Sequence, residues 1–237
     1  MANIANRLTI QIDLSGFSFK ITDPSGETLN SGRKSFPSGV SSASELEDIL
    51  KKELSSMSVL SKKYSQTDVV VETPTFTLVP ASLYDKESEK QILSQIHKVE
   101  DMDEVMSIDL PEHEAKLIYA IPNSISSRIF KIQKKAKYTP IIYQMIKKVS
   151  EQKENNKVCI HFSKNHIHIV ASERDRLLLA NSFQASDFIT AQYYIFFVIK
   201  EVMFNPEFTT LQIVGEIDKN QKKSLSKYFK GVNTISI

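Results

Sequence analysis

The sequence has one cysteine, no tryptophan and only six glycines among its 237 residues. Cys159 has no second cysteine to pair with, so disulfide bonds within the chain are excluded. Its neighbours Val158 and Ile160 are apolar, which favours a buried, reduced thiol of the kind found in cytoplasmic proteins. We therefore expect a cytoplasmic location and a hydrophobic core large enough to be stable without disulfides or metals.

The chain also lacks a long uninterrupted apolar segment. The longest apolar run, residues 188–204, is interrupted by Gln192, Lys200 and Glu201. A membrane-spanning helix needs about 20 predominantly apolar residues, so we expect a core helix here and no membrane insertion. The first 13 residues alternate apolar with polar side chains, which predicts a strand rather than the apolar block of a signal peptide.

Neither sign of charge dominates, because 30 Lys and Arg stand against 28 Asp and Glu, giving a formal net charge of +2. Affinity for nucleic acid grows with the number of phosphates neutralised, so this balance does not indicate a polyanionic partner. Two local clusters are basic: Arg128, Lys131, Lys134, Lys135 and Lys137, and then Lys219, Lys222, Lys223, Lys227 and Lys230. Solvated helix faces look the same, and aromatic residues suited to base stacking are not interleaved, so we do not expect nucleic acid as the partner.

Strand, turn and helix signals occur twice in the same order. The first half has three strands and a helix, at residues 7–14, 17–21, 28–32 and 44–54. The second half repeats this order and then adds a strand, a helix and a strand, at residues 158–162, 167–169, 177–180, 186–204, 211–217, 219–230 and 234–237. The pattern predicts an α/β protein made by duplication, with two mixed sheets, each of βββαβαβ order with flanking helices.

The middle of the chain continues this alternation. We expect further strands and helices, in order, at residues 69–71 (strand), 76–79 (strand), 81–96 (helix), 104–110 (strand), 115–121 (strand), 124–134 (helix) and 140–153 (helix). The predicted organisation is a first subdomain over residues 1–122, a helical connection over 123–156 and a second subdomain over 157–237.

The first hairpin opens on Ile12-Asp13-Leu14-Ser15-Gly16. Together with the strand order, this resembles the actin, hexokinase and heat-shock-protein ATPase superfamily, which has the actin-like ATPase (ribonuclease H-like) fold. The resemblance implies that backbone amides of this turn hold phosphate and that Asp13 acts through the metal ion. The superfamily usually has glycine where Ser15 stands here. Asp13 and Gly16 are also ordinary residues of a tight hairpin turn, and that alternative stays open.

Two other segments resemble the same superfamily. Residues 76–81 (FTLVPA) are similar to its strand-to-helix connection, and Pro80 suits the first position of a helix. The candidate adenosine loop is residues 213–217 (IVGEI), with Gly215 as the one glycine where the superfamily commonly has two. In the second half, Ser163 stands at the position equivalent to Asp13, so the resemblance implies a second phosphate loop without its acidic residue.

The whole chain resembles an uncharacterised bacterial family, a domain of unknown function with an actin-like fold. The segments that carry this resemblance are TFTLVPASLYD, LLLANSF and LQIVGEIDK, at residues 75–85, 177–183 and 211–219. The resemblance implies the fold over nearly the full length, but it does not imply an activity, because one fold supports many functions.

Three histidines lie on one predicted hairpin. His161, His166 and His168 alternate with apolar residues, so we expect all three on the same face. Imidazole groups placed in this way could bind zinc or copper. An acidic or thiol ligand does not accompany them at an obvious spacing, so we expect a solvated polar face and no metal site.

Phosphoryl transfer depends on anchored phosphate and metal cradles. Because one of the two loops lacks its carboxylate, we expect no catalytic residues and predict a non-catalytic actin-like scaffold or regulatory adaptor that acts on a partner protein. Asp13, Ser15, Gly16 and Gly215 would form a degenerate nucleotide cleft that could hold ATP and magnesium weakly. The alternatives are an ATP-binding phosphotransferase or ATPase with diverged loops, and a nucleic-acid-binding protein that uses the basic helices. The sequence does not indicate the oligomeric state.

Overall fold

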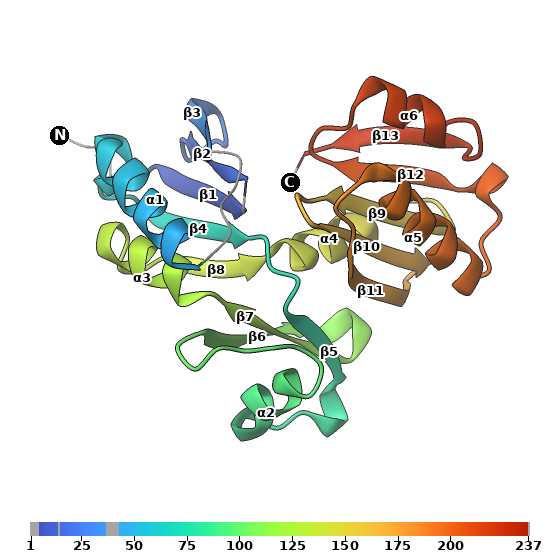
Figure 1. The fold of residues 1–237 in the computed structure, drawn as a ribbon, viewed down its shortest axis with the longest axis horizontal. Coiled ribbons are helices and arrows are strands. Elements are labelled where there is room, and N and C mark those ends of the chain that lie inside the picture. The colour runs from blue at the N-terminus through green and yellow to red at the C-terminus, as the bar shows by residue number, and fades with distance from the viewer. Residues whose placement is uncertain (1–4, 14, 37–42, 237) are drawn as a thin grey trace. The chain divides into compact units, whose positions relative to one another are not determined.

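The computed structural model describes residues 5–13, 15–36 and 43–236. The described chain divides into two compact units. The first unit comprises the described residues up to Val79 together with Leu83–Asp109 and Lys116–Ile141, and the second comprises Pro80–Ser82, Leu110–Ala115 and the described residues from Ile142 onward. Each unit contains a five-stranded sheet with helices packed against it (Figure 1).

The sheet of the first unit has the strand order β3-β2-β1-β4-β8. These strands are β1 (Arg7–Asp13), β2 (Gly16–Thr22), β3 (Thr28–Ser35), β4 (Gln66–Val71) and β8 (Lys137–Pro140). β1, β2 and β3 are antiparallel to one another in turn, whereas β4 runs parallel to β1, and β8 runs parallel to β4. In β1 the side chains of Leu8, Ile10 and Ile12 are fully buried, as the alternation in the sequence predicts.

Two helices of the first unit contact each other, α1 (Ala43–Ser56) and α3 (Asn123–Ile132). A short 3-10 helix, Ser58–Ser61, follows α1 and leads toward β4. The guanidinium of Arg128 in α3 forms an ion pair of 2.5 Å with the carboxylate of Glu47 in α1. This pair ties together two helices that are more than 80 residues apart in the sequence.

A smaller sheet, of order β5-β7-β6, is inserted between β4 and α3. Its elements are β5 (Phe76–Pro80), α2 (Glu89–Ser94), β6 (Glu104–Leu110) and β7 (Ala115–Ile121). Val79, Leu93, Ile118 and Ala120 form a hydrophobic cluster of buried residues here. The predicted strands at 104–110 and 115–121 are confirmed at the same residues.

The helix predicted over residues 81–96 is wrong in its first half. Two 3-10 helices, Ala81–Leu83 and Lys86–Ser88, precede α2. The side chain of Asp85 accepts a hydrogen bond from the backbone N–H of Glu87, which starts a new turn at that point. Aspartate side chains compete with the helix for backbone donors in this way, so the apolar periodicity alone overestimates the helix.

The sheet of the second unit has the order β11-β10-β9-β12-β13. These strands are β9 (Asn156–Phe162), β10 (His166–Glu173), β11 (Arg176–Gln184), β12 (Thr210–Val214) and β13 (Gly231–Ile235). β9, β10 and β11 are antiparallel in turn, and β12 runs parallel to both β9 and β13. Strand order and strand directions are therefore the same as in the first sheet, which confirms the duplicated βββαβαβ architecture.

Helices cover one face of the second sheet, and residues on the opposite face are buried as well. Residues of α5 (Phe188–Glu201) and α6 (Lys219–Leu225) belong to one core cluster with Val158 and Ile160 of β9. Cys159 points to the opposite face. Burial raises the pKa of its thiol to about 12, and the ammonium of Lys148 in α4 (Ile141–Ser150) opposes this rise.

The division into units differs from the boundaries expected at residues 122 and 156. Residues 123–140 supply α3 and the edge strand β8 to the first unit, whereas the sequence predicts a helical connection there. β8 has only four residues, and its parallel pairing with β4 supplies the hydrogen bonds that make it a strand. Such a strand depends on a partner 69 residues earlier and has little local signal.

The apolar run predicted as a core helix corresponds to α5, whose N-terminus is capped by Asp187. Its described length ends at Glu201, before the Asn205-Pro206 pair, which begins a short 3-10 helix. Taking the described ranges together, none of the helices is both long enough and apolar enough to cross a bilayer.

Candidate functional site

The β1–β2 turn brings together three of the residues predicted to hold a nucleotide. Asp13 ends β1, Ser15 lies in the turn and Gly16 begins β2. The Oδ1 atom of Asp13 accepts hydrogen bonds from the backbone N–H of Ser15, at 2.5 Å, and from the Ser15 hydroxyl. The Asp13 carboxylate and the Ser15 amide therefore satisfy each other within the turn. Leu14 of the same motif lies outside the described residues.

Gly16 is required by the packing of the sheet. It is paired with Ser35 of β3, and a Cβ atom at this position would lie 2.2 Å from the backbone carbonyl oxygen of Lys34. Real Cβ atoms are not found so close to a backbone oxygen. The close approach of two strands therefore accounts for a glycine here, as the hairpin alternative in the sequence implies.

The corresponding turn of the second unit is also closed by its own hydrogen bond. The backbone N–H of Ser163 donates to the carbonyl oxygen of His166 at 2.8 Å. Gly215, which the resemblance assigns to adenosine, follows β12 in the same unit with a φ of +85°. Its N–H donates to the carbonyl oxygen of Ile235 at 3.1 Å. Gly215 is exposed, and its positive φ explains why a glycine stands there.

A nucleotide would have to compete with the chain itself for three amides of these turns. A phosphate cradle needs backbone N–H groups aimed at the ligand. Instead, acceptors within the chain already take the N–H groups of three residues of these turns. The three donors are Ser15, Ser163 and Gly215. The Asp13 carboxylate, which the resemblance assigns to the metal, already accepts two hydrogen bonds from Ser15.

Two of the three histidines on the predicted face are buried, and His166 is half-buried. His161 and His168 lie directly opposite each other on β9 and β10, with ring centroids 5.9 Å apart, and only 8% and 0% of the two residues is exposed. The expectation of a solvated face is therefore wrong for these two residues, because Cys159 and Val170 beside them on the same strands are buried as well. Nδ1 of His161 is 3.1 Å from the Val214 carbonyl oxygen, which accepts its proton. In the described residues, no group of three or more His, Cys, Asp or Glu side chains could hold a metal ion.

The two basic clusters differ in their surroundings. In the first cluster, the guanidinium of Arg128 forms the ion pair with Glu47. The three lysines Lys131, Lys134 and Lys135 are exposed. In the second, on and after α6, the lysines are mostly exposed. The first cluster is therefore partly structural, and the second remains accessible at the surface.

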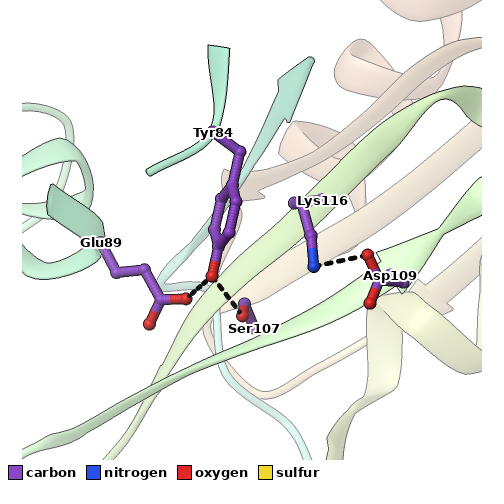
Figure 2. Close-up of polar contacts among 5 residues, drawn as sticks. All are labelled: Tyr84, Glu89, Ser107, Asp109 and Lys116. Atoms are coloured by element: carbon purple, nitrogen blue, oxygen red, sulfur yellow. Dashed lines mark hydrogen bonds and ion pairs between the residues drawn. The ribbon is translucent and has the colours of Figure 1, made fainter. Parts of the chain in front are cut away.

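A polar cluster that no sequence motif predicts lies on the inserted sheet. Its members are Tyr84, Glu89 of α2, Ser107 and Asp109 of β6 and Lys116 of β7 (Figure 2). The Tyr84 hydroxyl donates to Glu89 and shares a hydrogen bond of 3.1 Å with Ser107. The hydrogen bond to Glu89 raises the pKa of the Tyr84 phenol.

The second half of the same cluster is an ion pair. The ammonium of Lys116 lies 2.5 Å from the Asp109 carboxylate, and this contact raises the pKa of Lys116. Only Ser107 and Asp109 share an element, β6, and the spacing of the five residues in the sequence follows no motif. The local sequence therefore held no signal for this cluster. Its hydrogen bonds join α2 to the sheet, which is a structural role.

Comparison with known proteins agrees with the duplicated fold. A family model described as "Protein of unknown function (DUF3822)" matches residues 3–232. No curated protein matches the chain. A Bacteroides thetaiotaomicron protein with an actin-like ATPase fold and unknown function is similar over 99% of this chain and 94% of its own, with 23% identity and a TM-score of 0.80.

Two more distant solved structures share the architecture. In the PilM–PilN type IV pilus biogenesis complex, the similarity covers 97% of this chain and 88% of the other, with 10% identity and a TM-score of 0.60. The ethanolamine utilization protein EutJ from Carboxydothermus hydrogenoformans is similar over 97% of this chain and 84% of its own, with 8% identity and a TM-score of 0.51. At these identities the similarity concerns the fold alone. The family match spans almost the whole sequence, so this chain, which has the actin-like ATPase fold, belongs to the DUF3822 family of proteins of unknown function.

Proposed function

We propose that this protein is a non-catalytic adaptor of actin-like fold, which binds a partner protein and does not transfer phosphate. One observation carries the proposal: the three amides that the resemblance assigns to a nucleotide donate hydrogen bonds within the chain. These amides belong to Ser15, Ser163 and Gly215, and their acceptors are Asp13, His166 and Ile235.

A phosphoryl-transfer site depends on the positions of its donors and metal ions. Phosphoryl transfer needs little covalent chemistry from the protein, so its catalysis depends on donors and metal ions held in place before the reaction. To bind phosphate, the β1–β2 turn would have to release the Ser15 amide from Asp13. The Asp13 carboxylate would then lie beside the phosphate as a like charge, which is unfavourable unless a cation lies between them.

Partner binding is supported by the surface of the second unit and by analogy. Six large apolar residues of this unit are exposed: Ile189, Tyr193, Phe197, Met203, Phe208 and Tyr228. Three of them follow one another at a spacing of four residues on α5, and contiguous exposed apolar surface marks interaction sites. PilM has the same fold and is found in a complex with PilN. The analogy supports an adaptor but does not identify the partner.

Thermal unfolding with and without millimolar Mg-ATP tests the non-catalytic half of the proposal. A ligand that binds the folded state at about 100 times its Kd stabilises it by about 2.7 kcal/mol, which would raise the melting temperature by several degrees. We expect no change beyond that caused by magnesium alone, and no release of phosphate.

Two variants give the nucleotide test its control. A rise in melting temperature that disappears in Asp13→Ala but persists in Ser15→Ala would overturn the proposal and favour the ATPase or phosphotransferase alternative. Ser15→Ala removes the hydroxyl but keeps both the amide and the Asp13 carboxylate.

The adaptor half predicts that the tagged full chain, isolated from host cells after mild cross-linking, carries a partner protein in constant proportion. Recovery of the chain alone would contradict the adaptor role. Recovery of RNA or DNA whose binding weakens steeply with salt would instead favour the nucleic-acid alternative.

A further inference from the structure

Helix α5 presents an apolar face to solvent. Ile189, Tyr193 and Phe197 follow one another at a spacing of four residues, so they lie along one side of the helix. Their exposed fractions are 80%, 61% and 39%. The opposite side, which includes Ile195 and Val198, lies in the core. Surface helices normally carry charged and polar side chains on the solvent side, so this apolar row has no explanation in the packing of the unit itself.

Aromatic contacts extend this face on both sides of α5. Phe183 of β11 stacks on Tyr194 with ring centroids 4.6 Å apart. On the other side, Phe196 meets Tyr228 edge to face at 5.2 Å, and Tyr228 is 52% exposed. Neighbouring rings therefore hold the surface in one arrangement before any partner arrives. When a partner binds here, the side chains of this surface lose little conformational entropy, which favours affinity.

A row of lysines lies next to the apolar row. Lys219, Lys223 and Lys227 recur at a spacing of four residues along α6 and the turn that follows it, and all three are exposed. Within the residues that the structure describes, none of them forms an ion pair. The Phe196–Tyr228 contact joins α5 to this segment, so the positive row and the apolar row share one side of the second sheet.

The third component is the edge of the sheet. β11 is the outermost strand of the second sheet in the described chain, and residues 177–184 of it carry no charge. Natural edge strands usually carry charges, prolines or other features that prevent pairing with another chain. Phe183 connects this strand to α5 through Tyr194 and Phe197. An open strand edge offers backbone donors and acceptors that only another polypeptide can use.

We propose that the α5 row, the α6 lysine row and the β11 edge form one docking surface for an acidic, apolar-rich segment of a partner protein. The proposal rests on the adaptor function proposed above and specifies the surface and the chemistry of the partner. Apolar side chains of the segment cover Ile189, Tyr193 and Phe197, and its carboxylates face the lysine row. Buried aromatic anchors supply most of the affinity at such interfaces, and the complementary charges supply selectivity and speed of association.

Two rival occupants fit less of the surface. A second copy of this chain in a symmetric contact would bring the same patch against itself, and the lysine rows would repel each other. An anionic lipid bilayer would satisfy the lysines and the apolar row, but it would leave the β11 edge without hydrogen-bonding partners. An acidic peptide segment uses all three components.

Selection from a random peptide library displayed on phage, with the purified full chain as bait, tests the proposal whatever the identity of the partner. We expect enriched peptides to combine apolar residues with Asp and Glu. A fluorescein-labelled peptide of the enriched sequence should bind about tenfold more weakly to the double variant Y193S/F197S and to the double variant K223E/K227E. Its binding should also weaken as salt rises from about 50 to about 200 mM.

Two matched control variants make the same kinds of substitution, apolar to serine and lysine to glutamate, at exposed residues that are not part of this surface. Leu83→Ser removes an apolar side chain that is 73% exposed outside this surface, and K131E/K135E reverses two exposed charges of the other basic cluster. Both should bind the labelled peptide as the unchanged protein does. All substituted side chains lie at the surface, and unchanged melting temperatures confirm that the variants are folded.

Several results would overturn the docking surface. These are no enrichment, enriched peptides without acidic residues, or equal binding by all variants. Flotation with vesicles of phosphatidylcholine and phosphatidylglycerol that is lost in the variants would assign the surface to lipid instead. A mass that rises with concentration in sedimentation, and falls to the monomer in Y193S/F197S, would assign it to a second copy. Each of these outcomes can occur while the cross-linked chain still carries a partner protein, so failure of the surface and failure of the adaptor function remain distinguishable.

Discussion

The ammonium nitrogen of Lys116 lies 4.6 Å from the centroid of the Tyr84 ring, so the two side chains form a cation–π pair. The same tyrosine donates its hydroxyl proton to the carboxylate of Glu89, a residue that is only 9% exposed. One residue therefore binds a cation with its ring face and an anion with its hydroxyl. Through these contacts Tyr84 joins β7 to α2 within the inserted sheet.

Tyr84→Phe separates the two interactions, because it keeps the ring face and removes the hydroxyl. The carboxylate of Glu89 loses its donor, so the free energy of unfolding should fall by about 1–3 kcal/mol in urea denaturation. Asp109→Asn, at the exposed end of the Lys116 ion pair, should have a much smaller effect. Equal effects of the two substitutions would contradict the role given to the hydroxyl.

Gly16→Ala tests whether sheet packing explains this glycine. The added methyl group would meet the Lys34 backbone oxygen at 2.2 Å, which forces β2 and β3 apart and should cost about 1–3 kcal/mol without any nucleotide present. In Gly231→Ala the nearest atom is the Thr210 Cγ2 atom at 3.3 Å, and this side chain can move. We expect that variant to be closer to the unchanged protein, and the reverse order in guanidinium denaturation would refute the argument.

The thiol of Cys159 should be inert in the folded protein. Its side chain is fully buried, and burial raises its pKa to about 12, so the reactive thiolate is scarce near neutral pH. A thiol reagent that forms a coloured product should react only after denaturant is added, at a rate limited by unfolding. Immediate reaction of the native protein at pH 8 would show that this face of the second sheet is open.

The N-cap of α5 should contribute to acid sensitivity. Asp187 accepts hydrogen bonds from the backbone N–H of Thr190 at 2.9 Å and from the Thr190 hydroxyl at 2.8 Å, and these lower its pKa below 3.8. Because the folded pKa is depressed, the stabilisation is complete above the unfolded value and is lost as pH falls through the folded value. Asp187→Asn keeps a cap but cannot titrate.

Denaturation of both proteins at several pH values measures this contribution. The difference in stability between the unchanged protein and Asp187→Asn should shrink as the pH falls below the usual pKa of an aspartate. Other carboxylates titrate in the same range, but they do so in both proteins, so the difference isolates Asp187. A difference that stays constant over this range would show that the carboxylate charge does not stabilise the helix.

Local patterns predicted elements that depend on neighbours in the sequence. The alternation in Leu8, Ile10 and Ile12 predicted β1, and the strands at 104–110 and 115–121 appear at those residues. Both the missed strand β8 and the broken helix at 81–96 depend on contacts that periodicity does not record. β8 exists through its pairing with β4, and the break at Asp85 is made by one side-chain hydrogen bond.

Some features of the candidate site could likewise be predicted from the sequence, and others could not. The sequence placed Asp13, Ser15 and Gly16 in one turn, as found, and the proposal that they form part of a nucleotide cleft remains a prediction for the Mg-ATP experiment. The reason for Gly16 could not be read locally, because it is the carbonyl oxygen of Lys34, 18 residues later on β3. The five members of the Tyr84 cluster are likewise brought together only by the pairing of β6 with β7 and the position of α2.

The sequence by itself determined the repeated strand and helix order. The apolar periodicity that predicts each strand or helix depends only on residues that are close together in the sequence. Only the tertiary structure decided that His161 and His168 are buried, that the amides of the turns are already bonded, and that one face of α5 is apolar and exposed. Each of these depends on which distant segment covers a given face or accepts a given proton, and burial and hydrogen-bond partners are properties of that packing.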